Sequence, residues 1–185
     1  MFADVVKAAQ GVGSVSYGSI GNGSLGHLAV TMLAKSGKLD MVHVPYRGGG
    51  PLMSDAIAGH VPLAVGSVFL AKPHIDSGKL RALAVTTSQR SANLPGVPTV
   101  AESGFAGFDA PAWWAVLAPA KTPPEIVKRM NEEINAALKA PAVAQAFTEG
   151  GIAPLPGTPE RFAAFIGSEI DKYAQVIRGA RITLD

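Results

Sequence analysis

Residues 15–30, VSYGSIGNGSLGHLAV, contain the sequence pattern that is most informative about the fold. Its first part, Val15–Ile20, is predicted to form a short strand that runs into the glycine-rich loop Gly21–Ser24. Apolar residues then recur at helical spacing from Leu25 to Lys35, and a glycine two residues later closes the predicted helix. A strand, a short glycine-rich loop and a helix in this order predict a unit of an α/β fold.

The same alternation continues on both sides of this unit. The predicted elements are a helix over 2–10, a strand over 41–46, a helix that begins at Pro51, strands over 61–69 and 80–86, and a short helix over 100–103. The apolar run 61–69 is too continuous for a strand with one solvated face, so it is predicted to be buried on both faces. The pattern therefore predicts a parallel sheet with helices on both sides.

The C-terminal part has a different composition of elements. It contains one predicted strand, residues 113–117, and three predicted helices. These helices cover Thr122–Leu138, with Thr122 as N-cap and a buried apolar stripe, then 142–149 and 159–180. One strand and three helices do not make a self-sufficient α/β layer. We therefore expect residues 108–185 to complete a domain that begins elsewhere, whereas residues 1–107 form a nearly complete α/β domain.

Composition excludes several classes of protein. The formal net charge is +2 and the basic residues are scattered, so a nucleic-acid-binding face is not expected. The chain has no cysteine, which excludes disulfides and thiolate metal sites. The four histidines show no metal-ligand spacing, so we expect neither a metal nor a cofactor. No membrane-spanning segment and no signal peptide are recognisable in the sequence.

The most informative site is the loop between the first predicted strand and its helix. Glycines let a ligand approach the backbone, and the helix that follows presents free N–H groups with a partial positive charge. Such a loop suits a phosphate or a carboxylate, although a simple tight turn with a serine N-cap is the alternative. The candidate ligand contacts from this unit are Ser19, Gly21, Asn22, Gly23, Ser24 and His27.

Two further loops are expected at the same edge of the sheet, because the C-terminal ends of parallel strands lie together. They contribute the candidates Tyr46, Arg47 and Gly48 from one loop and Gly66 and Ser67 from the other. A last candidate is Trp114, whose flat ring could cover the carbon chain of a ligand.

Two other interpretations of this site fit parts of the pattern. The spacing Gly21-x-Gly23-x-x-Gly26 matches the dinucleotide fingerprint, and Arg47 could meet a 2′-phosphate, as in an NADP-binding oxidoreductase. A hydrolase built on Ser24 and His27 lacks the G-x-S-x-G motif and a third partner. We expect a binding protein and not an enzyme; a cytosolic ligand-sensing regulatory domain of similar topology is the remaining alternative.

Several ordered motifs resemble one family of bacterial receptors. They are YGSIGNGS (17–24) with HLA (27–29), HVPYRGG (43–49), PHIDSGKLRALAVT (73–86), LPGVPTVAESG (94–104), Trp114, APAKTP (118–123) and NEEIN (131–135). In these segments, which span nearly the whole chain, the sequence is similar to the substrate-binding proteins of tripartite tricarboxylate transporters, also called Bug receptors.

This resemblance implies a periplasmic-binding-protein-like fold of the Venus-flytrap type (type II), with two α/β domains that close on a small organic acid. Residues 1–107 would be most of the second domain, and 108–185 the returning part of the first. It implies a periplasmic location, membrane subunits as partners, and a dicarboxylate, tricarboxylate, acidic amino acid or aromatic acid as ligand. An incomplete first domain would expose apolar surface, so we also expect a homo-oligomer.

Overall fold

The computed structural model describes residues 1–11 and 14–183. Within them the elements follow the order α1 (Phe2–Gln10), β1 (Val15–Ser19), α2 (Leu25–Gly37), β2 (Met41–Pro45), α3 (Gly49–Ala58), β3 (Leu63–Ala64), α4 (Val68–Asp76), α5 (Pro124–Ala137), α6 (Pro141–Glu149) and α7 (Pro159–Ala180). The chain forms two compact units: residues 1–112 with 176–185, and residues 113–175. None of the helices in the described part is long and apolar enough to cross a membrane.

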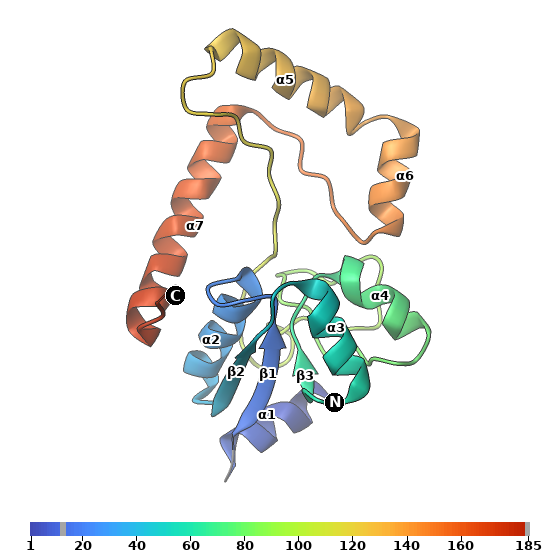
Figure 1. Cartoon of the computed structure of the whole chain (residues 1–185), viewed down its shortest axis with the longest axis vertical. Helices are drawn as coiled ribbons and strands as arrows, with labels where there is room; N and C mark the ends of the chain where they lie inside the picture. The colour runs from blue at the N-terminus through green and yellow to red at the C-terminus, as the bar shows by residue number, and fades with distance from the viewer. Residues whose placement is uncertain (12–13, 184–185) are drawn as a thin grey trace. The chain divides into compact units, whose positions relative to one another are not determined.

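The first unit is built on a parallel sheet of order β2-β1-β3 (Figure 1). Its central strand β1 pairs with β2 over five residues, from Val15 opposite Met41 to Ser19 opposite Pro45. On its other side β1 pairs with β3 through Tyr17 and Gly18. This arrangement confirms the predicted α/β fold with a parallel sheet.

Helices lie on opposite faces of this sheet, and successive residues of β1 point alternately to the two faces. The backbone of Gly18 faces α3, since a Cβ there would lie 2.5 Å from Cδ1 of Leu52. Its neighbours Tyr17 and Ser19 point to the other face, because successive strand side chains alternate. There the Tyr17 ring contacts that of His43, which in turn stacks on His27 of α2. The sheet is therefore covered on both sides, as predicted.

The main core of the first unit lies between α1, α2 and the segment that follows α4. Its buried members are Ala9, Ala29, Leu33, Leu39, Val100, Phe108 and Ala110. Apolar residues of the two helices meet here at the spacing seen in the sequence, which explains why both helices form where they were predicted.

Several predicted elements are corrected by the structure. The third strand is limited to Leu63–Ala64, and residues 68 and 69 belong to α4 instead. The reason is local: the Ser67 side chain accepts a hydrogen bond from the amide of Leu70 and begins a helix inside the apolar run. Helix α3 begins at Gly49, two residues before Pro51, which is tolerated because the first helical N–H groups have no intrahelical acceptor.

The predicted strand over 80–86 is reduced to one bridge, Val85 opposite Thr99, so it forms no ladder. Residues 100–103 form a turn and not a helix. Residues 113–117 form no strand within the described chain, and Val116 and Leu117 are more than 70% exposed. A strand requires a partner for its backbone groups, and the sequence of one segment alone does not supply it.

The second unit holds α5, α6 and the larger part of α7. The Trp113 ring packs edge-on against Phe162 and Phe165, and its Nε1–H donates to Glu169 at 3.0 Å. The helix α5 begins at Pro124 with Pro123 as N-cap, one residue later than predicted. Its expected apolar stripe is not buried: Ile126 and Met130 are each 47% exposed.

Candidate functional site

Three loops leave the same edge of the parallel sheet. They follow β1 (residues 20–24), β2 (46–48) and β3 (65–67). The loops are tied to the central strand by hydrogen bonds from the amide of Tyr46 to the carbonyl of Ser19 and from the amide of Val65 to the carbonyl of Gly18, both 2.9 Å. We call this edge, with the three loops and the helix starts behind them, the cradle.

The first wall of the cradle is the N-terminus of α2. Ser24 caps the helix by accepting from the amide of His27 at 3.3 Å. Gly21 and Gly23 have φ values of +143° and +71°, which side-chain-bearing residues rarely adopt, so glycine is needed to make this turn. The amides of Leu25 and Gly26, the first two helical positions, have no acceptor within the helix and remain available to a ligand.

The second and third walls are the N-termini of α3 and α4. Gly48, with φ of +105°, precedes α3, and the amides of Gly49 and Gly50 lie at its first two positions. A Cβ on Gly49 would lie 2.5 Å from Cδ1 of Leu70, so glycine allows α3 and α4 to approach each other. Helix α4 begins behind Ser67. Three helix starts on one sheet edge bring partial positive charges together, an arrangement that favours an anion.

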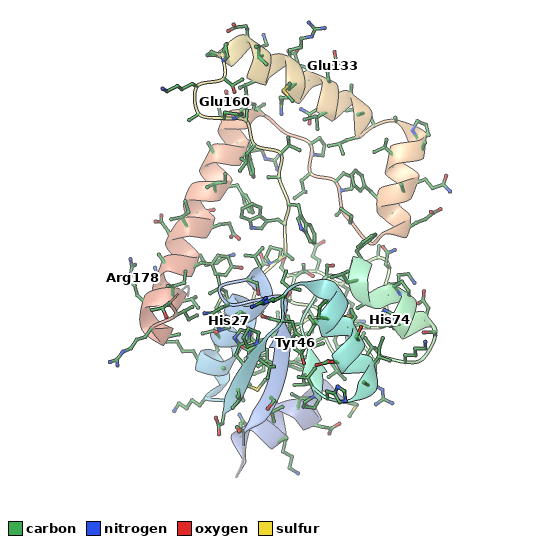
Figure 2. The ribbon with its side chains drawn as sticks, viewed as in Figure 1. His27, Tyr46, His74, Glu133, Glu160 and Arg178 are labelled. Carbon is green, nitrogen blue, oxygen red and sulfur yellow. The ribbon has the colours of Figure 1, made fainter. Side chains whose placement is uncertain are left out.

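A chain of polar side chains lies beneath the first loop. The fully buried Ser19 hydroxyl is 2.7 Å from Nε2 of His43 and accepts from the hydroxyl of Ser24 at 3.2 Å. The rings of His43 and His27 are stacked, with centroids 3.8 Å apart. His27 in turn accepts the amide of Gly23 at its Nδ1, at 3.0 Å. This chain connects the loop to the interior of the unit; its member His27 is labelled in Figure 2.

Both imidazoles are held neutral by their surroundings. Burial, together with the nearby His27, lowers the pKa of His43 to about 4. Burial also lowers the pKa of His27. On the same face, burial raises the pKa of the Tyr17 phenol to about 12. The groups beneath the cradle therefore carry no charge near neutral pH, and an anion bound above them would meet hydrogen-bond dipoles rather than a counter-ion.

The Tyr46 hydroxyl is engaged outside this chain. It donates to Oδ2 of Asp55 at 2.9 Å, and Oδ1 of the same carboxylate lies 3.3 Å from Nδ1 of His60. The hydrogen bond from Tyr46 is the main cause that lowers the pKa of Asp55. Desolvation first, and then the bond to Asp55, raises the pKa of Tyr46. This bond fixes the Tyr46 ring against Gly18, where a Cβ would come within 2.8 Å of it.

The structure brings most of the predicted ligand contacts to the cradle but gives several of them internal partners. Ser19 is buried, the amide of Gly23 is bound to His27, and Asn22 donates to the carbonyl of Thr183 at 2.7 Å. Gly21, Ser24, Gly48, Gly66 and Ser67 lie in the loops or at the helix caps, and Arg47 is exposed beside them. Trp114 belongs to the other compact unit and is 68% exposed.

Sequence reasoning missed two members of this region, His43 and Asp55. The position of His43 could have been inferred, since it lies opposite Tyr17 in the register of β1 and β2 and so shares its face. Asp55 gave no such signal, because its partner Tyr46 lies nine residues away across a turn of unknown shape. Among the described residues no cluster of three or more histidine or acidic side chains could hold a metal ion.

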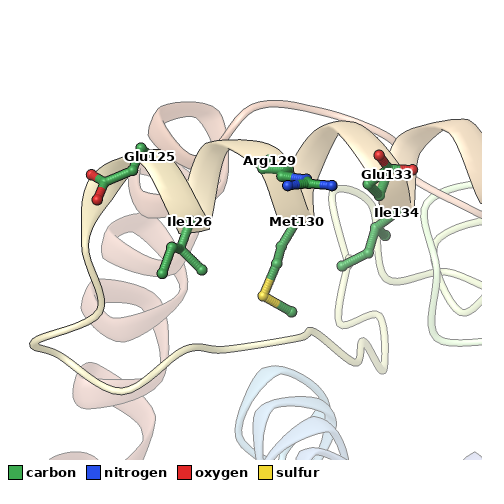
Figure 3. Close-up of a pocket in the computed structure, with 6 residues that line it drawn as sticks. All are labelled: Glu125, Ile126, Arg129, Met130, Glu133 and Ile134. Atoms are coloured by element: carbon green, nitrogen blue, oxygen red, sulfur yellow. The ribbon is translucent and has the colours of Figure 1, made fainter.

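A separate hollow lies on the second unit, along α5 (Figure 3). Its volume is about 530 Å³, and its lining residues are Glu125, Ile126, Arg129, Met130, Glu133 and Ile134. All six come from successive turns of one helix, so the hollow is an open groove along that helix. Its charged rim and apolar floor differ from the backbone-rich cradle.

Several solved structures share the fold of this chain over nearly its whole length. The chain superposes on a protein from R. palustris, solved with adipate, with a TM-score of 0.90 and 32% identity over 98% of this chain and 61% of the other. A structure described as a periplasmic transporter gives the same TM-score at 34% identity, over all of this chain and 62% of the other. MatC from Rhodopseudomonas palustris with bound malate gives 0.83 at 27% identity, over 95% and 61%. The fold is that of the periplasmic solute-binding proteins.

The family follows from the sequence. Residues 1–182 match the tripartite tricarboxylate transporter family receptor (TctC) profile, and the chain belongs to this family. It is 40% identical to a UPF0065 protein of the tcbD-tcbE intergenic region of Pseudomonas sp., over 94% of this chain and 52% of the relative. It is 38% identical to protein BugT of Bordetella pertussis, over 92% and 53%. The chain thus spans about half the length of these curated relatives.

Proposed function

We propose that this chain is a solute-binding receptor module that holds a small organic carboxylate in the cradle. The observation that carries this proposal is the convergence of three helix N-termini, α2, α3 and α4, on one sheet edge. A carboxylate accepts several hydrogen bonds, and the unbonded amides of the first helical positions supply donors. The relatives solved with adipate and with malate support a carboxylate as the class of ligand.

Binding is favoured over catalysis by the state of the hydroxyl groups. Ser19, which contacts a histidine and could otherwise serve as a nucleophile, is 0% exposed and cannot reach a substrate. The Ser24 hydroxyl contacts the Ser19 hydroxyl and the His27 amide rather than an imidazole nitrogen that could act as its base. A nucleophile needs an exposed oxygen next to a base, and the cradle does not offer one. We therefore propose a receptor and not an enzyme.

The two parts of the chain have different roles in this proposal. Residues 1–107 form the ligand-binding domain, and residues 108–185 belong to a second domain whose closure encloses the ligand. Trp114 and Arg47 would then contact the carbon chain and a second carboxylate of a dicarboxylate or tricarboxylate; an acidic amino acid or an aromatic acid also fits these groups. The receptor would work in the periplasm and deliver its ligand to membrane subunits of the transporter.

A self-association surface is also part of the proposal. Apolar side chains of the second unit are well exposed, among them Trp114, Val116, Leu117 and Leu155 at 68–82%. Exposed apolar patches usually mark interaction sites, so we propose that this unit pairs with a second copy in solution. Light scattering tests this directly: a dimer supports the proposal, and a monodisperse monomer at high concentration contradicts it.

A thermal-shift screen tests the ligand class. The purified chain is heated with adipate, malate, citrate, glutamate, terephthalate or NADP, since a ligand of the folded state raises the melting temperature. We expect a rise with at least one carboxylate and none with NADP. Asn22→Asp, which adds a negative charge at the tip of the first loop, should abolish this rise. Ser54→Asp, at an exposed position of α3, is the matched control and should leave it intact. A rise with NADP alone would instead favour an oxidoreductase.

A further inference from the structure

The hydroxyl of Ser19 has more polar neighbours than it can bind at once. His43 Nε2 lies at 2.7 Å, the carbonyl of Gly21 at 3.0 Å, the hydroxyl of Ser24 at 3.2 Å and the amide of Gly21 at 3.3 Å. A hydroxyl donates one hydrogen bond and accepts two. The neighbour to which the Ser19 hydroxyl donates its one hydrogen bond therefore determines the direction of its other hydrogen bonds.

Two arrangements satisfy this count. In the first, Ser19 donates to Nε2 of His43 and accepts from the Gly21 amide and from the hydroxyl of Ser24, so that both hydroxyls and the Gly21 amide are bonded. In the second, Nε2 of His43 carries a proton and donates to Ser19, which turns its own proton to the Gly21 carbonyl. Ser19 then has one acceptor site left, which the fixed Gly21 amide takes. The hydroxyl of Ser24 loses its acceptor and is free to point toward the cradle.

The neighbouring groups favour the first arrangement while the cradle is empty. It leaves no hydroxyl without an acceptor, whereas the second arrangement deprives Ser24 of one. His27 does not interfere, because it accepts from the amide of Gly23 through Nδ1 and therefore carries its proton on Nε2. Tyr17, the other titratable group in ring contact with His43, is neutral over the working pH range because burial raises its pKa.

We propose that His43 is a positioning residue that sets the direction of the Ser24 hydroxyl. With the cradle empty, Nε2 of His43 accepts from Ser19 and the Ser24 hydroxyl points inward. An anion above the loop accepts from Ser24 instead, and His43 changes tautomer to become the donor to Ser19. Nδ1 releases its proton to solvent water and Nε2 takes one from solvent water, so the ring stays neutral and Ser19 keeps its own proton. The ligand-driven step rests on the proposed function; the direction of bonding in the free protein does not.

Nuclear magnetic resonance of the chain with ¹⁵N-labelled histidine tests this inference. Long-range ¹H–¹⁵N correlations show which ring nitrogen carries the proton, and His43→Gln assigns the His43 signals. In the free protein we expect Nδ1–H on His43 and Nε2–H on His27. Ser19→Ala removes the donor, and the His43 proton should then move toward Nε2 while His27 is unchanged. Ser36→Ala, an exposed serine at the other end of α2, is the control and should change neither ring.

Adipate is the probe for the second half of the proposal. If it raises the melting temperature, saturation should move the proton of His43 to Nε2, and an unchanged His43 spectrum would overturn the ligand-driven step. If it gives no rise, the ligand assignment fails for adipate, and the spectra of the free protein and of Ser19→Ala decide the role of His43. Nε2–H on His43 in the free protein, or a spectrum indifferent to Ser19→Ala, overturns the inference.

Discussion

Replacing Gly18 by alanine tests how closely the centre of the sheet is packed beside the cradle. A Cβ at this position would lie 2.5 Å from Cδ1 of Leu52 and 2.8 Å from Cε2 of Tyr46. Leu52 is 0% exposed, so it has no free space to enter, and the strain must move α3 or the Tyr46 ring. Overpacking of this kind costs about 1–3 kcal/mol of unfolding free energy. In a chain of this size each kcal/mol lowers the melting temperature by about 2–4 °C.

Urea denaturation followed by circular dichroism measures this effect. The matched control is Gly50→Ala in the same unit, where a Cβ meets no atom within 4 Å and φ is not positive. Removal of a glycine at such an open position is expected to be neutral or to stabilise by up to about 1 kcal/mol. Equal stability of the two variants would refute the close packing of β1 against α3.

Three further predictions concern other contacts. Ser67→Ala should lower the free energy of unfolding by about 1 kcal/mol because it removes the cap of α4, whereas Ser67→Gly should lower it by only about a few tenths of a kcal/mol. Equal decreases in melting temperature for the two variants would argue against a capping role. Trp113→Phe should lower the free energy of unfolding by about 1–3 kcal/mol, because the buried Glu169 loses the hydrogen bond from the indole. Trp114→Phe is the control at an exposed ring and should change this free energy by no more than about 0.5 kcal/mol. The free energy of unfolding should fall as the pH drops from 6.5 toward about 4, because His43 takes up a proton in the unfolded state that the folded state excludes. In a pH series of urea melts, His43→Gln should make this fall shallower without abolishing it, since burial also lowers the pKa of His27.

The order of elements was predictable over residues 15–64, because a glycine or serine precedes α2 and α3 and stops the strand before each helix, whereas α4 was not predicted. The same pattern located the three loops of the cradle. The prediction of a single strand over residues 61–69 was wrong because this apolar run contains both β3 and the start of α4. Hydrophobicity alone does not separate the two elements. The capping role of Ser67 was the missing signal.

The hydrogen bonds beneath the cradle were harder to predict from the sequence than the loops themselves. The contact of Ser19 with His43 joins residues 24 positions apart and depends on the register of two strands. The bond from Asn22 to Thr183 spans 161 positions and could not be predicted from local pattern. Such contacts decide which donors remain for a ligand. The loop residues and the free N–H groups at the start of α2 were predictable, but the internal partners of Ser19, Asn22 and Gly23 were not.

An amide ¹H–¹⁵N titration of the chain with adipate tests the cradle as the binding site. We expect the largest shifts at the amides at the starts of α2 and α3, which should saturate together: Leu25, Gly26, Gly49 and Gly50. Amides in the middle of α5, for example that of Arg129, should not move. Saturable shifts confined to the groove along α5, with none in the cradle, would contradict the assignment of the cradle as the carboxylate site.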